Sequence, residues 1–357
     1  MVLKQEKFLL LGLLAAIIAY VTEHTILASG QLTSLIATAV LVGVIVMVSM
    51  RVAHHAEVLA ERVGEPYGTM ILTLSAVLIE VVILLIMLQH KVSPTLVRDT
   101  IYSAVMLDIN GILGLAAILG GLKYGEQKYN IDSGNTYIVM IMTAMGVSMV
   151  IPEFIPMGHW QIYSAFTVGI MLLLYAVFLR MQTGKHSYFF SYTYAAQHHE
   201  GATHHQAPIW HSVALLVVGV TLIGVLAEVM SKTMDVGLAG TGMPPMIAGL
   251  VVATISASPE ILTALRAALA NRMQPAVNIA LGASLSTVIL TVPVIECYAL
   301  LSGTPIHMAL TPTQTAMALL TLLVAGINLH DGESNAIEGM THFALFATFL
   351  MLTALGM

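Results

Sequence analysis

Two glutamates stand deep inside long apolar stretches of the chain. Glu80 lies in TMILTLSAVLIEVVILLIML, and Glu260 lies in MIAGLVVATISASPEILTAL. A carboxylate at membrane depth costs at least about 2.5 kcal/mol by insertion scales, so intramembrane acids usually serve a function. Carboxylate oxygens are ligands that a hard cation such as Ca²⁺ prefers, and protons can take the place of the cation. We expect a cation- and proton-binding site; two protonated acids that hydrogen-bond between helices are the structural alternative.

Oxygen-bearing side chains accompany both acids. Thr73 precedes the first acid by two helical turns, and Ser256 precedes the second by about one turn, so each lies on the face of its acid. Ser258 and Pro259 stand directly before the second acid, and a proline inside a helix frees backbone carbonyls that could serve as oxygen ligands. These residues predict a site of oxygen ligands in which the two glutamates hold Ca²⁺.

The apolar stretch that follows each acid carries further polar residues. Asn110 begins a stripe of small residues, and a third acid, Asp108, precedes it by two positions. In the second half, Asn278 and Ser286 share one helix face, and Ser284 lies on another. Small residues also let helices pack closely, so tight packing is a competing explanation for the serines. For the third acid, both a functional role and a place near the membrane surface remain open.

Composition restricts the class of protein. Of 357 residues, 58% are hydrophobic and 9% are charged, the mean hydropathy is +0.89, and the net charge is −6. Such a chain is not a soluble enzyme or a nucleic-acid binder, because it lacks the charged surface and the basic stripe that these need. Its one cysteine cannot form an internal disulfide, and the sequence contains no CxxC motif that could bind zinc. The sequence predicts an all-α polytopic protein of the lipid bilayer.

Apolar runs long enough to cross a membrane recur along the chain. We expect eleven spans: 8–22, 31–50, 67–89, 99–120, 135–152, 161–180, 208–230, 244–268, 276–299, 311–328 and 340–356. With the N-terminus in the cytoplasm, ten Lys and Arg residues fall inside and three outside, so this orientation is favoured and the C-terminus is expected outside.

Ten spans remain when the first is set aside, five on each side of a polar linker. An odd number of spans per half inverts the second half in the membrane, and inverted repeats are typical of secondary transporters. Glu80 and Glu260 occupy matching positions, the third and the eighth span. We therefore predict four segments: an extra N-terminal helix (1–30), a first repeat (31–180), a His-rich cytoplasmic linker (181–207) and a second repeat (208–357).

These residues resemble a known family. HHAEVLAERVGEPYGTMILTLSAVLIEV, ASPEILTALRAALANRMQPAVNIALGASLSTVILTVPV and INLHDGESNAIEGMTHFALF are similar, in order and spacing, to the cation/proton exchangers of the cation/Ca²⁺ exchanger superfamily, most of all the bacterial ChaA-type Ca²⁺(Na⁺)/H⁺ antiporters. The resemblance implies a sodium/calcium exchanger-like fold. It also implies that Glu80 and Glu260 bind the cation and the protons and that Asn110 and Ser284–Ser286 supply further ligands.

The resemblance also matches Glu57 and Glu228 with acids on gating helices near the mouths of the pathway, although a solvated charge at a helix end is an alternative for both. Two departures bear on the substrate. The contexts AVLIE and SASPE differ from the GNA(T/A)E common in the broader family, and the linker carries histidines (His198, His199, His204 and His205) in place of an acidic run. The histidines suggest a pH or metal sensor, or a solvated linker.

The function expected is Ca²⁺ export in exchange for H⁺ by alternating access, in the inner membrane of a prokaryote. A Na⁺(K⁺)/H⁺ antiporter using the same acids is the nearest alternative, and a Na⁺/Ca²⁺ exchanger is a more distant one. Enzymes are disfavoured, because no HExxH motif lies on a spanning helix and the His199–Glu200 pair is in the linker. No cofactor is expected beyond the transported cations (Ca²⁺, H⁺, Na⁺ or K⁺), and a homo-oligomer remains open.

Overall fold

The computed structural model describes residues 6–63, 67–90, 93–184, 187–190 and 209–357. Almost all of this chain is helical, and two short strands, β1 (Gln127–Lys128) and β2 (Glu333–Ser334), pair antiparallel. The first half contains α2 (Lys7–Ala28), α3 (Gln31–Val63), α4 (Tyr67–Gln89), α5 (Leu96–Met106), α6 (Gly114–Tyr124), α7 (Ile131–Met145) and α8 (Trp160–Thr183). The second half contains α9 (Ile209–Leu238), α10 (Met246–Leu269), α11 (Met273–Ser286), α12 (Val292–Ser302), α13 (Pro312–Asn328) and α14 (Ala336–Leu355).

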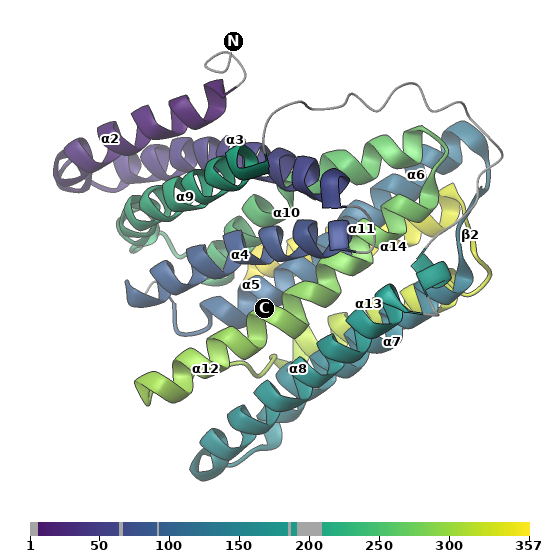
Figure 1. Ribbon diagram of the computed structural model, residues 1–357. Helices are drawn as coiled ribbons and strands as arrows, with labels where there is room; N and C mark the ends of the chain where they lie inside the picture. Colours follow the sequence, from purple (N-terminus) through teal and green to yellow (C-terminus); the bar gives the residue numbers. More distant parts are fainter. Residues whose placement is uncertain (1–5, 64–66, 91–92, 185–186, 191–208) are drawn as a thin grey trace.

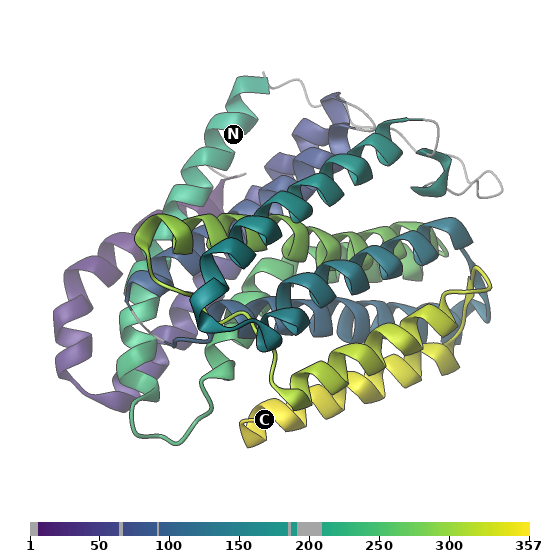
Figure 2. The ribbon, with the colours of Figure 1, turned by 90° about the horizontal axis from the view of Figure 1, so that it is seen from below.

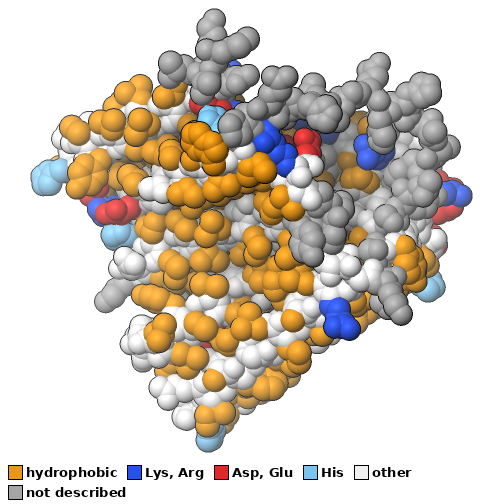
Figure 3. Space-filling model, viewed as in Figure 1, with side chains coloured by type: hydrophobic (Ala, Val, Ile, Leu, Met, Phe, Trp, Pro, Cys, Tyr) orange, Lys and Arg blue, Asp and Glu red, His pale blue; other side chains and the backbone are white. Residues whose placement is uncertain are grey.

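Each of the eleven predicted spans coincides with helix. Within the described residues, ten helical segments are long and apolar enough to cross a membrane. The one predicted span that is not among them, 311–328, corresponds to α13, a helix of 17 residues. Figure 3 shows the matching surface, on which apolar side chains are spread over the visible face and charged side chains are sparse. Leu301 is 90% exposed and Val21 is 74% exposed, as lipid-facing residues are. The protein is a multi-pass integral membrane protein.

The largest difference from the predicted spans is the length of α3. The predicted span ends at residue 50, but α3 continues to Val63 as one helix of 33 residues. RVAHHAEVLAERV contains no Gly or Pro, and its apolar residues recur at helical spacing, so that Val52, Ala56 and Leu59 are buried. The charged residues between the two predicted spans, Arg51 to Arg62, therefore lie on a helix that extends beyond its apolar part.

The helices form three groups (Figures 1 and 2). The long helices α3 and α9 pack along each other, and α2 packs against both. In Figure 1 this group lies at the upper left, α7, α8 and α13 lie below, and the helices that carry the predicted acids lie between them. The most buried spans are 96–124 and 273–302, which run through this middle layer. The core therefore surrounds the acids.

Corresponding spans of the two halves share an irregularity. Span 96–124 is interrupted by a π-helical turn, η1 (Leu107–Leu113), and span 273–302 by another, η6 (Thr287–Thr291). A further π-helical turn, η2 (Gly146–Val150), follows α7, and 3₁₀ turns η3 (Ile151–Phe154), η4 (Met157–His159) and η5 (Ser187–Phe190) occur before and after α8. π-Helical turns are rare and frequently occur at functional sites, because the extra residue turns side chains to a new face.

The residue that precedes α2, Glu6, binds α3 through its side chain. Glu6 is buried, and its carboxylate forms a salt bridge with Arg51 and contacts His55 Nε2 at 3.3 Å. Burial raises the pKa of Glu6, but the hydrogen bonds from Arg51 and His55 lower it by more, so the pKa lies below its usual value. The N-terminal helix is thereby joined to the helix pair α3 and α9.

Glycines bring α6 and α14 into backbone contact. A Cβ atom on Gly339 would lie 2.5 Å from the backbone nitrogen of Ile118 and 2.7 Å from the carbonyl oxygen of Gly114. A Cβ atom on Gly114 would in turn lie 2.9 Å from Cβ of His342. Only glycine allows this approach, which is the usual device for close helix packing in membranes.

We expect Gly339→Ala to destabilise the protein by roughly 1–3 kcal/mol, because the added methyl group must push two helix backbones apart. Thermal unfolding of the purified protein in detergent measures the effect. Gly169→Ala, on the exposed face of α8 with nothing within 4 Å of the new methyl group, is the matched control. Equal unfolding temperatures for the two variants would contradict the close packing of α6 and α14.

Candidate functional site

The predicted acids lie on two helices that pack against each other in the middle layer. Glu80 on α4 is 2% exposed, and its Oε2 accepts a hydrogen bond of 2.9 Å from the hydroxyl of Thr287 on η6. Its other oxygen, Oε1, is buried and has no hydrogen-bond partner among the described residues. Glu260 on α10 is partly exposed. The two acids therefore differ in exposure, and Glu80 is the more enclosed.

Asp108 is the third acid of this region. It is 1% exposed, its Oδ2 accepts a hydrogen bond of 3.1 Å from Ser284 Oγ, and its Oδ1 has no partner among the described residues. Its carboxylate interacts electrostatically with Glu260 and Glu80. The structure encloses Asp108 in protein within the span 96–124, beside the two glutamates.

The three acids border one small cavity of about 10 Å³, roughly the room for a single water molecule. Ser256, Ser286 and Thr287 contribute hydroxyl groups to the same lining. Within the described part of the chain, no three acids, histidines or cysteines lie close enough together to hold one metal ion. In this conformation the acids surround a common space, but they do not yet form a compact ligand shell.

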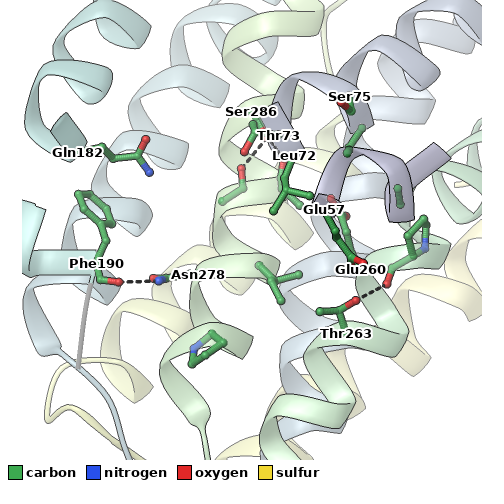
Figure 4. Close-up of a pocket in the computed structure, with 18 of the residues that line it drawn as sticks. Glu57, Leu72, Thr73, Ser75, Gln182, Phe190, Glu260, Thr263, Asn278 and Ser286 are labelled. Atoms are coloured by element: carbon green, nitrogen blue, oxygen red, sulfur yellow. Dashed lines mark hydrogen bonds between the residues drawn. The ribbon is translucent and has the colours of Figure 1, made fainter. Parts of the chain in front are cut away.

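A second cavity of about 840 Å³ connects this region with the surface. Glu260, Ser256 and Ser286 line both cavities, so the second carboxylate lies at their junction. Figure 4 shows Glu57, Thr73 and Asn278 around the larger cavity with Glu260. The lining extends to the exposed residues Thr183 and Arg272, beyond the ends of the central helices. Ions can therefore approach Glu260 from one end of the bundle.

Pro259 changes the local bonding of α10 without leaving a free carbonyl. A proline has no N–H with which to bond the carbonyl four residues earlier, Ile255. The hydroxyl of Ser258 donates to this carbonyl instead, at 2.8 Å. Ser258 lines neither cavity, and Ser256 donates to the carbonyls of Val252 and Ala253 while it faces both cavities. Ser258 thus compensates for the proline, whereas Ser256 faces the acids.

Two predicted ligands are bonded elsewhere in this conformation. The amide of Asn110 donates to Thr321 Oγ1 at 2.7 Å, and its oxygen lies 3.0 Å from Nδ1 of His342, on the side of η1 that faces α13 and α14. The amide of Asn278 lines the larger cavity but donates to the carbonyl of Phe190 at 2.8 Å. The structure does not bring either side chain to the acids.

The two predicted gating acids differ in their surroundings. Glu57, on the long helix α3, lines the larger cavity and lies 3.9 Å from His54 Nδ1. Glu228, on α9, pairs at 3.1 Å with Lys232, which also binds Glu23 of α2. Both side chains are 46% exposed, but Glu228 lines neither cavity. The four linker histidines of the predicted sensor lie outside the described residues.

Two polar residues of the interior were not among the predicted site residues. Thr287, the first residue of η6, donates its hydroxyl to Glu80, and its place about one helical turn after Ser284 was the signal that could have identified it. His342 is 3% exposed in α14, and its Nε2 has no partner among the described residues. A histidine within the apolar span 336–355 was the signal that could have identified it.

The fold and this arrangement of acids define the class of protein. The architecture matches the solved structure of YfkE, which is named a Ca²⁺/H⁺ antiporter, with a TM-score of 0.73 and 20% sequence identity over 93% of this chain and 99% of that one. This is the sodium/calcium exchanger-like fold, with one extra N-terminal helix and two inverted repeats of five helices. This likeness shows the fold, and membership of the sodium/calcium exchanger family makes the protein a secondary ion exchanger and not an enzyme.

The sequence assigns the family. Residues 33–184 and 211–355 match the family model of the sodium/calcium exchanger protein, and the chain belongs to that family. It is 32% identical over 355 residues to a protein of Sinorhizobium fredii named an ionic transporter, y4hA, covering 97% of this chain and 95% of that one. It is 33% identical to the sodium-potassium/proton antiporter ChaA of Escherichia coli (84% of each chain) and 26% identical to the Ca²⁺/H⁺ antiporter ChaA of Bacillus subtilis (75% and 77%).

Because the two glutamates differ in exposure, we expect them to differ in chemical reactivity. A water-soluble carbodiimide should modify Glu260 faster than Glu80, because Glu260 borders the 840 Å³ cavity and Glu80 is 2% exposed. Peptide mass spectrometry of the purified protein measures both rates, with the half-exposed Glu57 as the reactive reference. Faster modification of Glu80 than of Glu260 would contradict the described geometry.

Proposed function

We propose that this protein is a cation/proton antiporter that exports Ca²⁺ from the cytoplasm in exchange for protons. The observation that carries the proposal is the set of three membrane-buried carboxylates around one cavity, of which one also borders a cavity that reaches the surface. Oxygen ligands of this kind suit Ca²⁺, and acids suit protons. The names of two relatives, both cation/proton antiporters, support the same class of function.

The end of the bundle at which the larger cavity opens carries many of the basic residues. Arg272 lines the cavity at this end, and Arg62 and Arg266 lie in the last turns of α3 and α10. The distribution of Lys and Arg assigns this end to the cytoplasm. At the opposite end, α10 and α5 are in backbone contact, since a Cβ atom on Gly249 would lie 2.7 Å from the carbonyl carbon of Asp99. On this assignment, the conformation is open to the cytoplasm and sealed on the outside.

Charge neutralisation couples the two ions. Unpaired carboxylates in a low-dielectric interior repel one another and are poorly solvated, so a site without bound ions is costly to occlude. Ca²⁺ neutralises two carboxylates, and two protons do the same. Only a neutralised site should pass through the occluded state, which forbids leak of either ion. With protons flowing inward, Ca²⁺ leaves the cell.

Glu260, at the junction of the cavities, is placed to receive the cation first, and Glu80 and the hydroxyls of Ser256 and Ser286 to complete its ligands. Because the acids do not form a compact shell in the open conformation, the cation must draw α4 and α10 together as it binds. The long helices α3 and α9 pack against this pair and would slide as gates. The cell membrane of a prokaryote, an inner membrane, is the location that fits this role.

Exchange of Na⁺ or K⁺ for protons is the second candidate. The relative that is named a sodium-potassium/proton antiporter is 33% identical to this chain, whereas the named Ca²⁺/H⁺ antiporter is 26% identical. The same acids would serve, because a monovalent cation neutralises one carboxylate and leaves the others to protons. The choice between the two functions therefore needs a measurement.

Everted membrane vesicles with an acidic interior provide that measurement. Addition of CaCl₂, NaCl or KCl should collapse the pH gradient, reported by a fluorescent dye, through whichever cation is the substrate. A response to micromolar Ca²⁺ supports the first proposal, and a response to Na⁺ or K⁺ alone supports the second. If no cation produces a response above that of vesicles without the protein, proton-coupled exchange is wrong.

In the same vesicles, Glu80→Gln and Glu260→Gln should each abolish the cation-driven proton movement. Glutamine keeps the size of the side chain but cannot exchange a proton for a cation. Glu333→Gln is the matched control, because this acid lies at the surface in β2 and pairs with Lys128. Response rates in either core variant that equal those of the control would reject the two glutamates as the site.

Asp108→Asn should weaken the site without abolishing exchange. Fewer charged ligands lower the affinity of a Ca²⁺ site, so we expect the half-saturating Ca²⁺ concentration to rise roughly tenfold. A monovalent cation depends less on the third charge, and its half-saturating concentration should change less. Titration of the dye response with each cation gives both values. Unchanged values for every transported cation would show that Asp108 takes no part in binding.

A further inference from the structure

The larger cavity is far roomier than an inorganic cation requires. Its volume of about 840 Å³ falls in the range of pockets that hold drug-sized molecules. Apolar side chains form part of its wall, among them Leu72, Ile79 and Ile279. A hydrated metal ion gains nothing from contact with an apolar wall, because such a wall cannot replace its water. The cavity therefore has room and surface that the passage of Ca²⁺, Na⁺ or K⁺ does not use.

Three aromatic rings that pack against one another form one side of this cavity. Tyr137 of α7, Phe178 of α8 and Phe190 of η5 (Ser187–Phe190) all line it, and their ring centres lie 5.4–5.8 Å apart. Tyr137 and Phe178 are buried, whereas Phe190 is partly exposed, so Phe190 is the most accessible of the three. The face of an aromatic ring attracts a cation, most strongly where water is excluded.

Carboxylates line the other side of the cavity. Figure 4 shows Glu57 and Glu260 across the cavity from Phe190. Arg272, which is exposed, also lines the cavity, so acids outnumber bases by two to one among the described lining residues. A molecule that spans the cavity therefore meets aromatic rings on one side and negative charge on the other.

We propose that the larger cavity is a binding site for organic cations, that is, for molecules that carry a positive charge on an apolar or aromatic body. The body displaces water from the apolar wall and the rings, and the charge lies within the field of Glu57 and Glu260. A ligand in this position occupies the route to Glu260, so it competes with the transported inorganic cation. This last consequence rests on the proposed function, whereas the binding itself does not.

Equilibrium binding of radiolabelled methyltriphenylphosphonium to the purified full-length protein in detergent tests the site, with the signal from detergent alone subtracted. At about pH 9, well above the ordinary pKa of a carboxyl group, few protons compete with the probe. Triphenylphosphine oxide has the same rings without the charge, and tetramethylammonium has the charge without the rings. Unlabelled methyltriphenylphosphonium should displace the label at a concentration about tenfold lower than either compound, because only it uses both sides of the cavity.

Phe190→Leu should weaken the binding of methyltriphenylphosphonium by roughly fivefold, because leucine keeps an apolar side chain but removes the face of the ring. Phe189→Leu is the matched control. The ring of Phe189 packs against Tyr188 in the same segment and does not line the cavity, so this variant should bind the probe as the unmodified protein does.

Glu57→Gln and Glu260→Gln should each weaken binding by about threefold or more, because each removes one negative charge and keeps the size of the side chain. Glu228→Gln is the control for Glu57→Gln. Both of these side chains are 46% exposed on long helices, but Glu228 lines neither cavity. The carboxylate variants carry the test if Phe190→Leu does not elute as a single folded species.

Equal displacement by triphenylphosphine oxide would overturn the proposal, because the cavity would then not select for charge. Unchanged affinity in the folded Phe190→Leu, Glu57→Gln and Glu260→Gln proteins would overturn it as well, since the probe would then bind elsewhere. Binding that weakens in these variants, in a protein whose vesicles show no cation-driven proton movement, would support the site and count against the proposed antiport alone. The two proposals can therefore fail separately.

Discussion

The cost of holding negative charge inside a membrane governs this structure. Glu80, Glu260 and Asp108 lie around one small cavity, and two of their oxygens have no partner within the described chain. An apolar interior does not tolerate such groups unless a cation or a proton accompanies them. The surrounding helices thus need to provide close packing, a route for ions and a way of closing that route.

The packing is achieved by irregularities that a regular helix lacks. The π-helical turns η1 and η6 occur in corresponding spans of the two halves, and Asp108 and Thr287, which line the small cavity, lie at the start of these turns. Glycines then allow backbones to meet, Gly249 against α5 and Gly339 against α6. The site consequently lies among the most buried spans of the described chain, and the long helices α3 and α9 pack beside it.

The two halves are related in architecture but not in chemistry. The glutamates correspond, yet the first half adds an acid at its π-helical turn and the second half adds a threonine. The access route is also one-sided, because the larger cavity reaches Glu260 while Glu80 remains enclosed. A structure with this asymmetry is suited to take up an ion from one side, which is what an alternating-access exchanger requires in each of its conformations.

The sequence by itself determined the class of protein, the positions of the eleven spans and the presence of two acids inside them. Apolar runs and a buried charge are local features, and lipid imposes the same rule on every span. Only the tertiary structure decided which polar groups meet. Asn110 contacts His342 rather than the acids, and Asp108 lines the small cavity with the two glutamates. Ser258 donates to the carbonyl of Ile255, which Pro259 cannot bond. These directions depend on contacts between segments far apart in the sequence, which helical periodicity does not encode.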